Sequence, residues 1–240
     1  MKIGLIGYGK MGQAVEKTAL ALGHEIVWTL TSANKGEIMP ATLKSADVII
    51  EFSRPDAAFE NVISCLNAGV PVVCGTTGWY EHLDDIHNYA IEKNTAAFVA
   101  SNFSIGVNLF LEVSNALAAL MSRYADYQPS IHEIHHLKKL DSPSGTAITL
   151  AQGILQANPN LKKWATEATN DKSVLSVTSE RFGEVPGTHV ITWNSTVDAI
   201  ELHHKAHNRE GFALGAVRAA EFLKSVNSAG LFGMRQLLGL

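Results

Sequence analysis

The chain has 240 residues, 46% of them hydrophobic, which is enough for one large core or two modest ones. Its formal net charge of −4 provides no basic surplus to neutralise phosphodiesters, so we do not expect nucleic acid as a partner. The sequence shows neither a signal peptide nor a stretch of about 18 apolar residues that could cross a bilayer, which favours a cytoplasmic protein with no membrane partner. The two cysteines, Cys65 and Cys74, lack the spacing of metal ligands, and we expect no metal site.

The apolar segment Lys2–Ile6 predicts a strand, and the sequence GYGKMG follows it directly, before a helical run that begins at Lys10. In a dinucleotide-binding unit the first glycine permits a tight turn, the second lets a pyrophosphate approach the backbone, and the third packs the helix on the strand. Gly7, Gly9 and Gly12 stand in this context. We therefore predict that this segment binds a dinucleotide cofactor.

Strands and helices then alternate with short connections. The predicted strands are 25–30, 48–52, 70–74 and 96–100, and the predicted helices between them are 55–66 and 80–92. Alternation of this kind is typical of α/β proteins in which helices cover both faces of a parallel sheet. The sequence thus predicts a Rossmann-like, doubly wound parallel sheet.

Polar clusters follow three successive strands of this predicted sheet. They are Ser53 with Arg54, then Gly75, Thr76, Thr77 and Gly78, then Ser101, Asn102 and Phe103. Ligands of open α/β sheets bind beyond the carboxyl ends of the strands. Each cluster taken alone could be an ordinary turn. Because all three fall at one edge, we interpret that edge as a ligand site.

The residues after the second strand predict the choice of cofactor. An acidic residue there would hold the ribose hydroxyls of NADH, and none is present; the chain has Thr31, Ser32, Asn34 and Lys35 instead. Hydroxyl, amide and ammonium groups can donate hydrogen bonds to a 2′-phosphate. We therefore expect NADPH to be preferred over NADH by a modest factor, on the order of tenfold.

The alternation ends near Gly106. We predict a helix to about residue 124, a strand at 130–136, a helix ending near 155, a polar surface loop at 158–172, and strands at 173–181, 189–194 and 199–205. Short turns between strands favour a second, α+β domain with a mixed, mainly antiparallel sheet and helices on one face. The other face would expose Val190, Trp193 or Ile200, and an apolar patch of that size would require burial in an assembly.

Two further segments extend beyond this sheet. A helix at 210–224 and the apolar segment 230–240 are expected to return to the first domain. We therefore divide the chain into a dinucleotide-binding domain, residues 1–105 and 209–240, and a substrate-binding and oligomerisation domain, residues 106–208.

The stretch EIHHLKKLDSPSGTA, residues 133–147, combines two histidines, two lysines and a helix-opening signal. Ser142 before Pro143 predicts that the helix begins at the proline, with the serine as N-cap. The backbone N–H groups of the next residues, through Gly145 and Thr146, would then lie at the positive end of the helix dipole. An anion is expected to bind there.

The two histidines end a predicted strand, so His135 and His136 lie on opposite faces and only one can face a given pocket. Lys138 and Lys139 follow in the connection, where an ammonium could bind a second negative group. Each of these side chains could by itself be simply solvated. Together they favour a small substrate with two carboxylates that needs a proton.

Four motifs in this order, GYGKMG, GTTG, SNFSIGVN and HHLKKLDSPSGTA, resemble those of the dihydrodipicolinate reductase family, also called 4-hydroxy-tetrahydrodipicolinate reductase. The resemblance continues through REGFALGAVRAAEF and GLFGMR and so runs from Lys2 to Leu240. It implies that NADPH or NADH reduces a cyclic imine, 4-hydroxy-tetrahydrodipicolinate, in the diaminopimelate and lysine pathway. It also implies a homotetramer built through the second-domain sheets.

The resemblance implies a role for each matching residue. His135 is similar to the general acid of the family, and Lys139 to its second proton donor and carboxylate partner. The remaining substrate-binding positions are His136, Gly145 and Thr146. The implied cofactor-binding positions are Gly7, Tyr8, Gly9, Lys10, Met11, Gly12, Gly75, Thr76, Thr77, Ala100, Ser101, Asn102 and Phe103.

Three alternatives stay open at the level of sequence. Lys138 could take the role of Lys139, because the two lysines are adjacent. The chain could also be another two-domain NAD(P)-dependent oxidoreductase that shares only the logic of the first domain. A protein of a different class, which senses a nucleotide without catalysis, would have the same fold.

Overall fold

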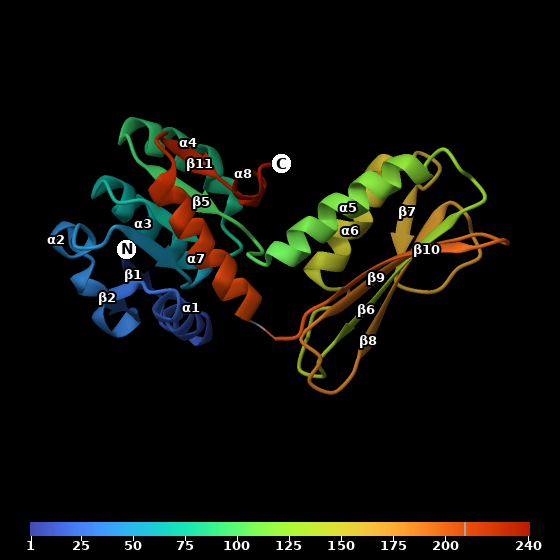
Figure 1. Ribbon diagram of the computed structural model, residues 1–240, viewed down its shortest axis with the longest axis horizontal. Helices are drawn as coiled ribbons and strands as arrows, with labels where there is room; N and C mark the ends of the chain where they lie inside the picture. Colours follow the sequence, from blue (N-terminus) through green and yellow to red (C-terminus); the bar gives the residue numbers. More distant parts are fainter. Residues whose placement is uncertain (209) are drawn as a thin grey trace. The chain divides into compact units, whose positions relative to one another are not determined.

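The structure, a computed structural model, describes residues 1–208 and 210–240, apart from the side chains of residues 35–37. The described residues divide into two units, each with its own core (Figure 1). The first comprises Met1–Ile105 and Glu210–Leu240, and the second comprises the described residues between these segments. None of the helices in this part of the chain is long and apolar enough to span a membrane.

In the first unit, short apolar strands form a parallel sheet with the order β11-β5-β4-β3-β1-β2. The strands are β1 (Lys2–Ile6), β2 (Glu25–Leu30), β3 (Val48–Glu51), β4 (Val72–Cys74), β5 (Ala96–Val99) and β11 (Gly230–Phe232). The chain passes from β1 to β2 on one side and then crosses to β3 on the other side of β1. This reversal of strand order creates a crevice at the carboxyl ends of β1 and β3.

Helices cover both faces of this sheet. One face is packed by α1 (Lys10–Ala21), α7 (Glu210–Ser225) and α8 (Met234–Leu238). The other is packed by α2 (Pro40–Leu43), α3 (Pro55–Asn67) and α4 (Leu83–Glu92), while short 3₁₀ helices lie at Ser32–Glu37 and Tyr80–His82. Burial on both faces explains why the strands read as continuous apolar runs. The predicted doubly wound α/β sheet is confirmed.

The second unit contains a mixed sheet with the order β10-β9-β6-β8-β7. Its strands are β6 (Gln128–His135), β7 (Lys163–Ala165), β8 (Val174–Arg181), β9 (Thr188–Asn194) and β10 (Ala199–Lys205). β9 pairs antiparallel with β6 and β10, but β6 with β8 and β8 with β7 pair parallel, so the antiparallel share is smaller than expected. β7 also lies inside the predicted surface loop, because its three residues are too few to show a period.

Helices α5 (Ile105–Met121) and α6 (Gly145–Ala157) cover one face of this sheet. Along β6, buried and half-buried side chains alternate strictly, which places Ile131, Glu133 and His135 on the helix-covered side. Trp193 is fully buried on the same side, and Ile200 is its direct partner on β10. Our expectation that these two residues lie on the open face was therefore wrong.

The open face of the sheet is instead mostly polar. Two cross-strand rows lie on it: Ser176, Ser130, Thr192 and Glu201, and beside them Thr178, His132, Val190 and His203. Of the three apolar residues predicted there, Val190 is the one that register places on this face, and it is half-buried. Val190 and Trp193 are three residues apart on β9, and because successive side chains of a strand point to opposite faces, the two could not share one face.

Candidate functional site

A cleft of ≈ 470 Å³ lies at the crevice of the first unit. Its polar lining comes from the turn after β1, the end of β2 and the start of α3, and consists of Gly7, Tyr8, Gly9, Thr31, Ser32, Ser53, Arg54, Asp56 and Asn61. Arg54 is exposed and pairs with Asp56. Ser53 and Arg54 were predicted as part of the ligand-binding edge but were not assigned to the cofactor, and both line this cleft. The side chain of Lys35 lies outside the described residues.

The three glycines of GYGKMG have different surroundings. Gly7 has a φ of +89°, and a Cβ on it would lie 2.0 Å from the Phe52 carbonyl oxygen. A Cβ on Gly12 would lie 2.3 Å from the Gly7 carbonyl oxygen, whereas a Cβ on Gly9 would meet nothing within 4 Å. A side chain would therefore clash with the backbone at Gly7 and Gly12, whereas the space beside Gly9 is unoccupied by the protein. Helix α1 begins immediately after Gly9 without a side-chain cap, so its first N–H groups can meet an anion.

The other predicted cofactor residues lie along the neighbouring connections. Lys10 and Met11 lie in the first turn of α1, Gly75 to Thr77 follow β4, and Ala100 to Phe103 follow β5. The hydroxyl of Thr76 accepts a hydrogen bond from the Ser53 backbone at 2.8 Å, which joins the connections after β3 and β4. Phe103 is buried against Phe52 and Phe98, so its side chain belongs to the core.

A buried acid that the sequence analysis did not single out supports this edge. Glu51, at the end of β3, is fully buried and accepts hydrogen bonds from the Ser53 backbone at 3.0 Å and from Asn61 at 3.3 Å. The thiol of Cys74 donates to its other oxygen at 2.9 Å. Burial, together with the charge of Glu51, raises the pKa of the Cys74 thiol, which fits a core residue rather than a reactive one.

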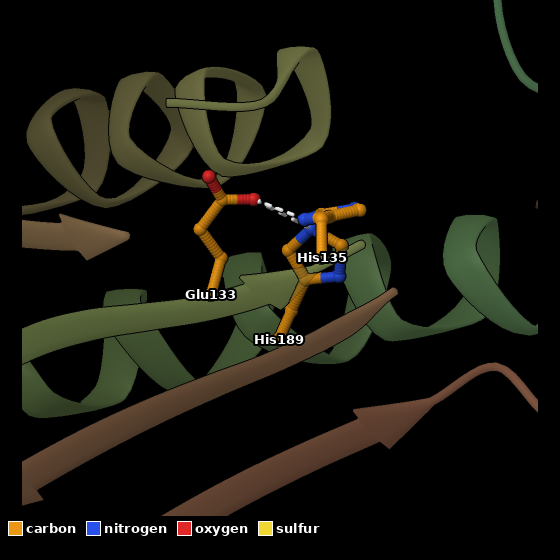
Figure 2. Close-up of side chains that lie close together, drawn as sticks. All are labelled: Glu133, His135 and His189. Atoms are coloured by element: carbon orange, nitrogen blue, oxygen red, sulfur yellow. Dashed lines mark ion pairs between the residues drawn. The ribbon is translucent and has the colours of Figure 1, made fainter. Parts of the chain in front are cut away.

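In the second unit, the end of β6 places an acid beside a histidine. Glu133 and His135 are two residues apart on one face, and Glu133 Oε2 lies 2.6 Å from His135 Nδ1. Figure 2 shows the carboxylate directed at the rings of His135 and His189, the latter from β9. The alternation of β6 could have revealed the first pair. His189 could not be found in this way, because only the β6–β9 register sets it opposite Glu133.

Glu133 is fully buried, and its Oε1 is held by two donors. The Ser144 backbone N–H donates to it at 3.1 Å, and Arg181 Nη2 donates at 3.1 Å. Burial opposes ionisation of this carboxyl, but hydrogen bonds from His135 and Ser144 outweigh that effect and hold its pKa well below the ordinary value. Glu133 is therefore an anion that only accepts hydrogen bonds.

His189 is a buried neighbour of this pair. Its Nε2 lies 3.1 Å from Ser144 Oγ and 3.9 Å from Glu133 Oε2, and its ring stands edge-on to that of His135 with centroids 5.1 Å apart. Burial, followed by the proximity of His135, lowers the pKa of His189 to about 4. His189 is thus neutral near pH 7 and adds no charge beside His135.

Donor atoms of Glu133, His135 and His189 lie within 4.8 Å of one another, so a metal ion must be considered. Two ligand atoms that each lie about 2 Å from one tetrahedral ion are about 3.3 Å apart, so the 2.6 Å between Glu133 Oε2 and His135 Nδ1 fits a direct acid–histidine pair better than a shared ion. The other carboxylate oxygen is already held by Ser144 and Arg181.

The helix after this cluster begins later than predicted. Its N-cap is Ser144, whose hydroxyl accepts the Ala147 N–H at 3.2 Å, and Pro143 precedes the helix. Ser144 becomes the N-cap because its backbone N–H also donates to Glu133. This contact joins residues that are 11 positions apart, and local capping preferences cannot predict it. Gly145 and Thr146 are the first helical residues, and a Cβ on Gly145 would meet nothing within 4 Å. The predicted anion site is open at this point.

The two lysines of the connection differ in environment. The Lys139 side chain is 20% exposed and lies 2.8 Å from Asp141, whereas that of Lys138 is 83% exposed with a distant Glu184 partner. His136 is half-buried directly after β6. Burial and a close partner favour Lys139 over Lys138 as a group that binds a ligand in a defined position.

Two family models cover nearly all of the chain. The model described as dihydrodipicolinate reductase, N-terminus, matches residues 1–103, and the one described as dihydrodipicolinate reductase, C-terminus, matches residues 106–238. The chain belongs to the dihydrodipicolinate reductase family. This membership confirms the family resemblance, and the matched ranges contain the glycine turn and the histidine-lysine stretch.

Other members of the dihydrodipicolinate reductase family match most or nearly all of this chain. The 4-hydroxy-tetrahydrodipicolinate reductase of Christiangramia forsetii is 44% identical over 99% of this chain and 98% of its own. That of Chromobacterium violaceum is 36% identical over 83% of this chain and 76% of its own. A dipicolinate-bound dihydrodipicolinate reductase from Paenisporosarcina has the same fold, with a TM-score of 0.78 at 24% identity over 97% of both chains.

The low pKa of His189 predicts how stability depends on pH. In the unfolded chain His189 is protonated below its ordinary pKa of 6.5, whereas in the folded chain it is protonated only below about pH 4. The free energy of unfolding should therefore fall as pH is lowered through this window. Urea unfolding at several pH values should show that the free energy of unfolding of His189→Gln depends less on pH than that of the wild type. His207→Gln, at an exposed histidine of the same unit, is the matched control; an equal pH dependence of stability in both variants would contradict the assignment.

Proposed function

We propose that the chain is a cytoplasmic 4-hydroxy-tetrahydrodipicolinate reductase, which uses NAD(P)H to form tetrahydrodipicolinate in the diaminopimelate and lysine pathway. The observation that carries the proposal is the juxtaposition at the end of β6. There a histidine paired with a buried carboxylate is followed by a partly buried lysine and an open helix start. These groups suit a substrate that carries two carboxylates and takes up a proton.

The first unit fits a dinucleotide cofactor. The open position at Gly9 and the uncapped start of α1 would hold its pyrophosphate, and the cleft beyond, lined by Thr31, Ser32 and Arg54, would hold its adenosine end. When bound, the nicotinamide cofactor supplies a hydride. We accordingly regard residues 1–105 with 209–240 as the dinucleotide-binding domain, and residues 106–208 as the substrate-binding and oligomerisation domain.

The residues of the second unit would bind the substrate and provide the proton. The N–H groups of Gly145 and Thr146 would bind one carboxylate, and Lys139, after exchanging its Asp141 partner, would bind the other together with His136. Addition of hydride to the conjugated imine leaves negative charge on the substrate. His135 would neutralise it by donating a proton from Nε2, because Nδ1 is engaged with Glu133.

His135→Ala should lower kcat by about 10²- to 10⁴-fold, since this is the usual contribution of proton delivery. Lys139→Ala should also lower turnover and should weaken inhibition by pyridine-2,6-dicarboxylate. NAD(P)H oxidation coupled to a synthase that generates the unstable substrate measures both effects. Lys138→Ala, at the exposed neighbour, is the control and should behave like the wild type. Normal turnover in the His135 and Lys139 variants would refute this mechanism.

We propose that NADPH is preferred over NADH by a factor on the order of tenfold. Thr31 and Ser32 line the cleft, and Arg54 adds a guanidinium that can bind a phosphate. Arg54→Gln should therefore lower kcat/KM for NADPH more than for NADH, and high salt should reduce the preference of the wild type. Arg218→Gln, which removes an arginine from α7, is the control. A clear preference of the wild type for NADH would contradict the proposal.

We also propose a homotetramer, as the family resemblance implies. The edge strand β10 is exposed along most of its length, and unpaired N–H and C=O groups on such an edge can pair with another chain. The mostly polar face beside it offers hydrogen-bonding groups from His132 and Thr192 and an apolar contact from Val190 for the same interface. Light scattering at micromolar concentration should give four times the chain mass of 25.9 kDa. A monomeric mass would refute the assembly.

A further inference from the structure

We propose that Glu133 is a positioning residue that keeps His135 competent to carry a second ring proton and aims its Nε2 at the substrate. The inference rests on the proposed function of His135 as proton donor. It assigns the buried carboxylate a specific task, namely that of compensating the charge of an imidazolium ring that is itself almost fully buried.

The position of the carboxylate is defined from three directions. Its Oε1 accepts from the Ser144 N–H and from Arg181, so Oε2 is the atom left to face His135. Arg181 also donates to the Asp141 carbonyl oxygen at 2.7 Å, which anchors the guanidinium. An oxygen held in this way, 2.6 Å from Nδ1, would accept the Nδ1 proton and limit rotation of the ring. Nε2 is then the nitrogen that can give up a proton.

Space beside Nε2 is provided by a glycine. Gly187 has a φ of +156°, and a Cβ at this position would lie 3.0 Å from His135 Nε2. Because Gly187, just before β9, carries no side chain, no Cβ at this position crowds Nε2. The ring thus contacts Glu133 through Nδ1, while residue 187 places no side chain beside Nε2.

The charged and titratable groups around His135 come from each neighbouring strand and connection. Glu133 supplies negative charge from β6, Arg181 positive charge from β8, and Lys139 and Asp141 a pair of opposite sign from the connection. On the β9 side, His189 is neutral near pH 7, and His204 of β10 has a pKa that burial lowers. Glu133 is the negative group in direct contact with the ring.

The clamp on Oε1 determines what an amide would do in place of the carboxylate. In Glu133→Gln the amide oxygen would occupy the Oε1 position, because Ser144 and Arg181 both donate there. The amide NH₂ would then face His135 Nδ1 and donate to it. A ring that accepts at Nδ1 cannot also carry a proton there, so His135 would remain neutral. The substitution is isosteric and reverses the hydrogen bond without removing it.

We therefore expect Glu133→Gln to lower kcat at pH 7 by about 100-fold or more, with little change in KM for the substrate. The alkaline limb of the kcat profile should move to lower pH. Nitrogen-15 NMR of His135, assigned by its loss in His135→Asn, should show protonation only at lower pH than in the wild type. Glu180→Gln, which removes an exposed carboxylate from the same sheet, is the matched control and should keep the wild-type profile.

A second variant tests the same relation in the opposite direction. Arg181→Met removes the positive charge that competes for Glu133, so the alkaline limb and the NMR titration of His135 should move to higher pH. A variant that merely loosens the fold would not produce shifts of opposite sign in the two cases. Thermal unfolding monitors whether both variants fold.

The outcomes separate this inference from the proposed function. A loss of kcat in Glu133→Gln with an unchanged pH profile and an unchanged His135 titration would reduce Glu133 to a structural role and overturn the inference. Activity equal to that of the Glu180 control would overturn it as well. If the wild-type chain failed to reduce the substrate, the proposed function would fall, while the titration, which needs no turnover, would still measure the coupling of Glu133 to His135.

Discussion

The buried carboxylate of Glu133 holds together the functional end of the second unit. It accepts from the start of α6 and from Arg181 on β8, and it contacts His135 on its own strand and faces His189 on β9. Burying an ionised carboxyl without such partners costs on the order of several kcal/mol of folding free energy. The start of α6 and strands β6, β8 and β9 are therefore held close together around this anion, and the candidate site lies there.

Ser144 shows how this constraint extends to the helix. Its N–H binds Glu133, while its hydroxyl accepts from Ala147 and contacts His189. One residue thus caps α6, satisfies the anion and joins β9. Because the cap is fixed to the strand that carries His135, the N–H groups proposed to bind a substrate carboxylate keep a defined position relative to that histidine. Preorganisation of this kind lowers the cost of orienting a bound molecule.

The first unit uses a buried acid in a similar place. Glu51 ends β3 and binds the backbone of Ser53 and the amide of Asn61, and Ser53 in turn donates to Thr76 after β4. The connections at the cofactor edge are thereby tied to the sheet. In both units, a carboxylate at the end of a strand organises the loops that would contact a ligand, and its burial makes the arrangement sensitive to the loss of any partner.

Local patterns in the sequence determined much of this protein. Gly7 and Gly12 are required because any side chain would collide with backbone atoms, and the apolar runs of the first unit reflect burial on two faces. The motifs also identified the family. These features depend on the backbone geometry of neighbouring residues, which short segments encode.

The tertiary structure alone decided the cap at Ser144, the side of the sheet on which Trp193 lies, and the pairing of β7 with β8. It also decided that His189 faces Glu133, residues 56 positions apart that only strand register brings together. Partners of a buried charge are chosen by proximity in space, and a linear pattern of residue types does not record that proximity.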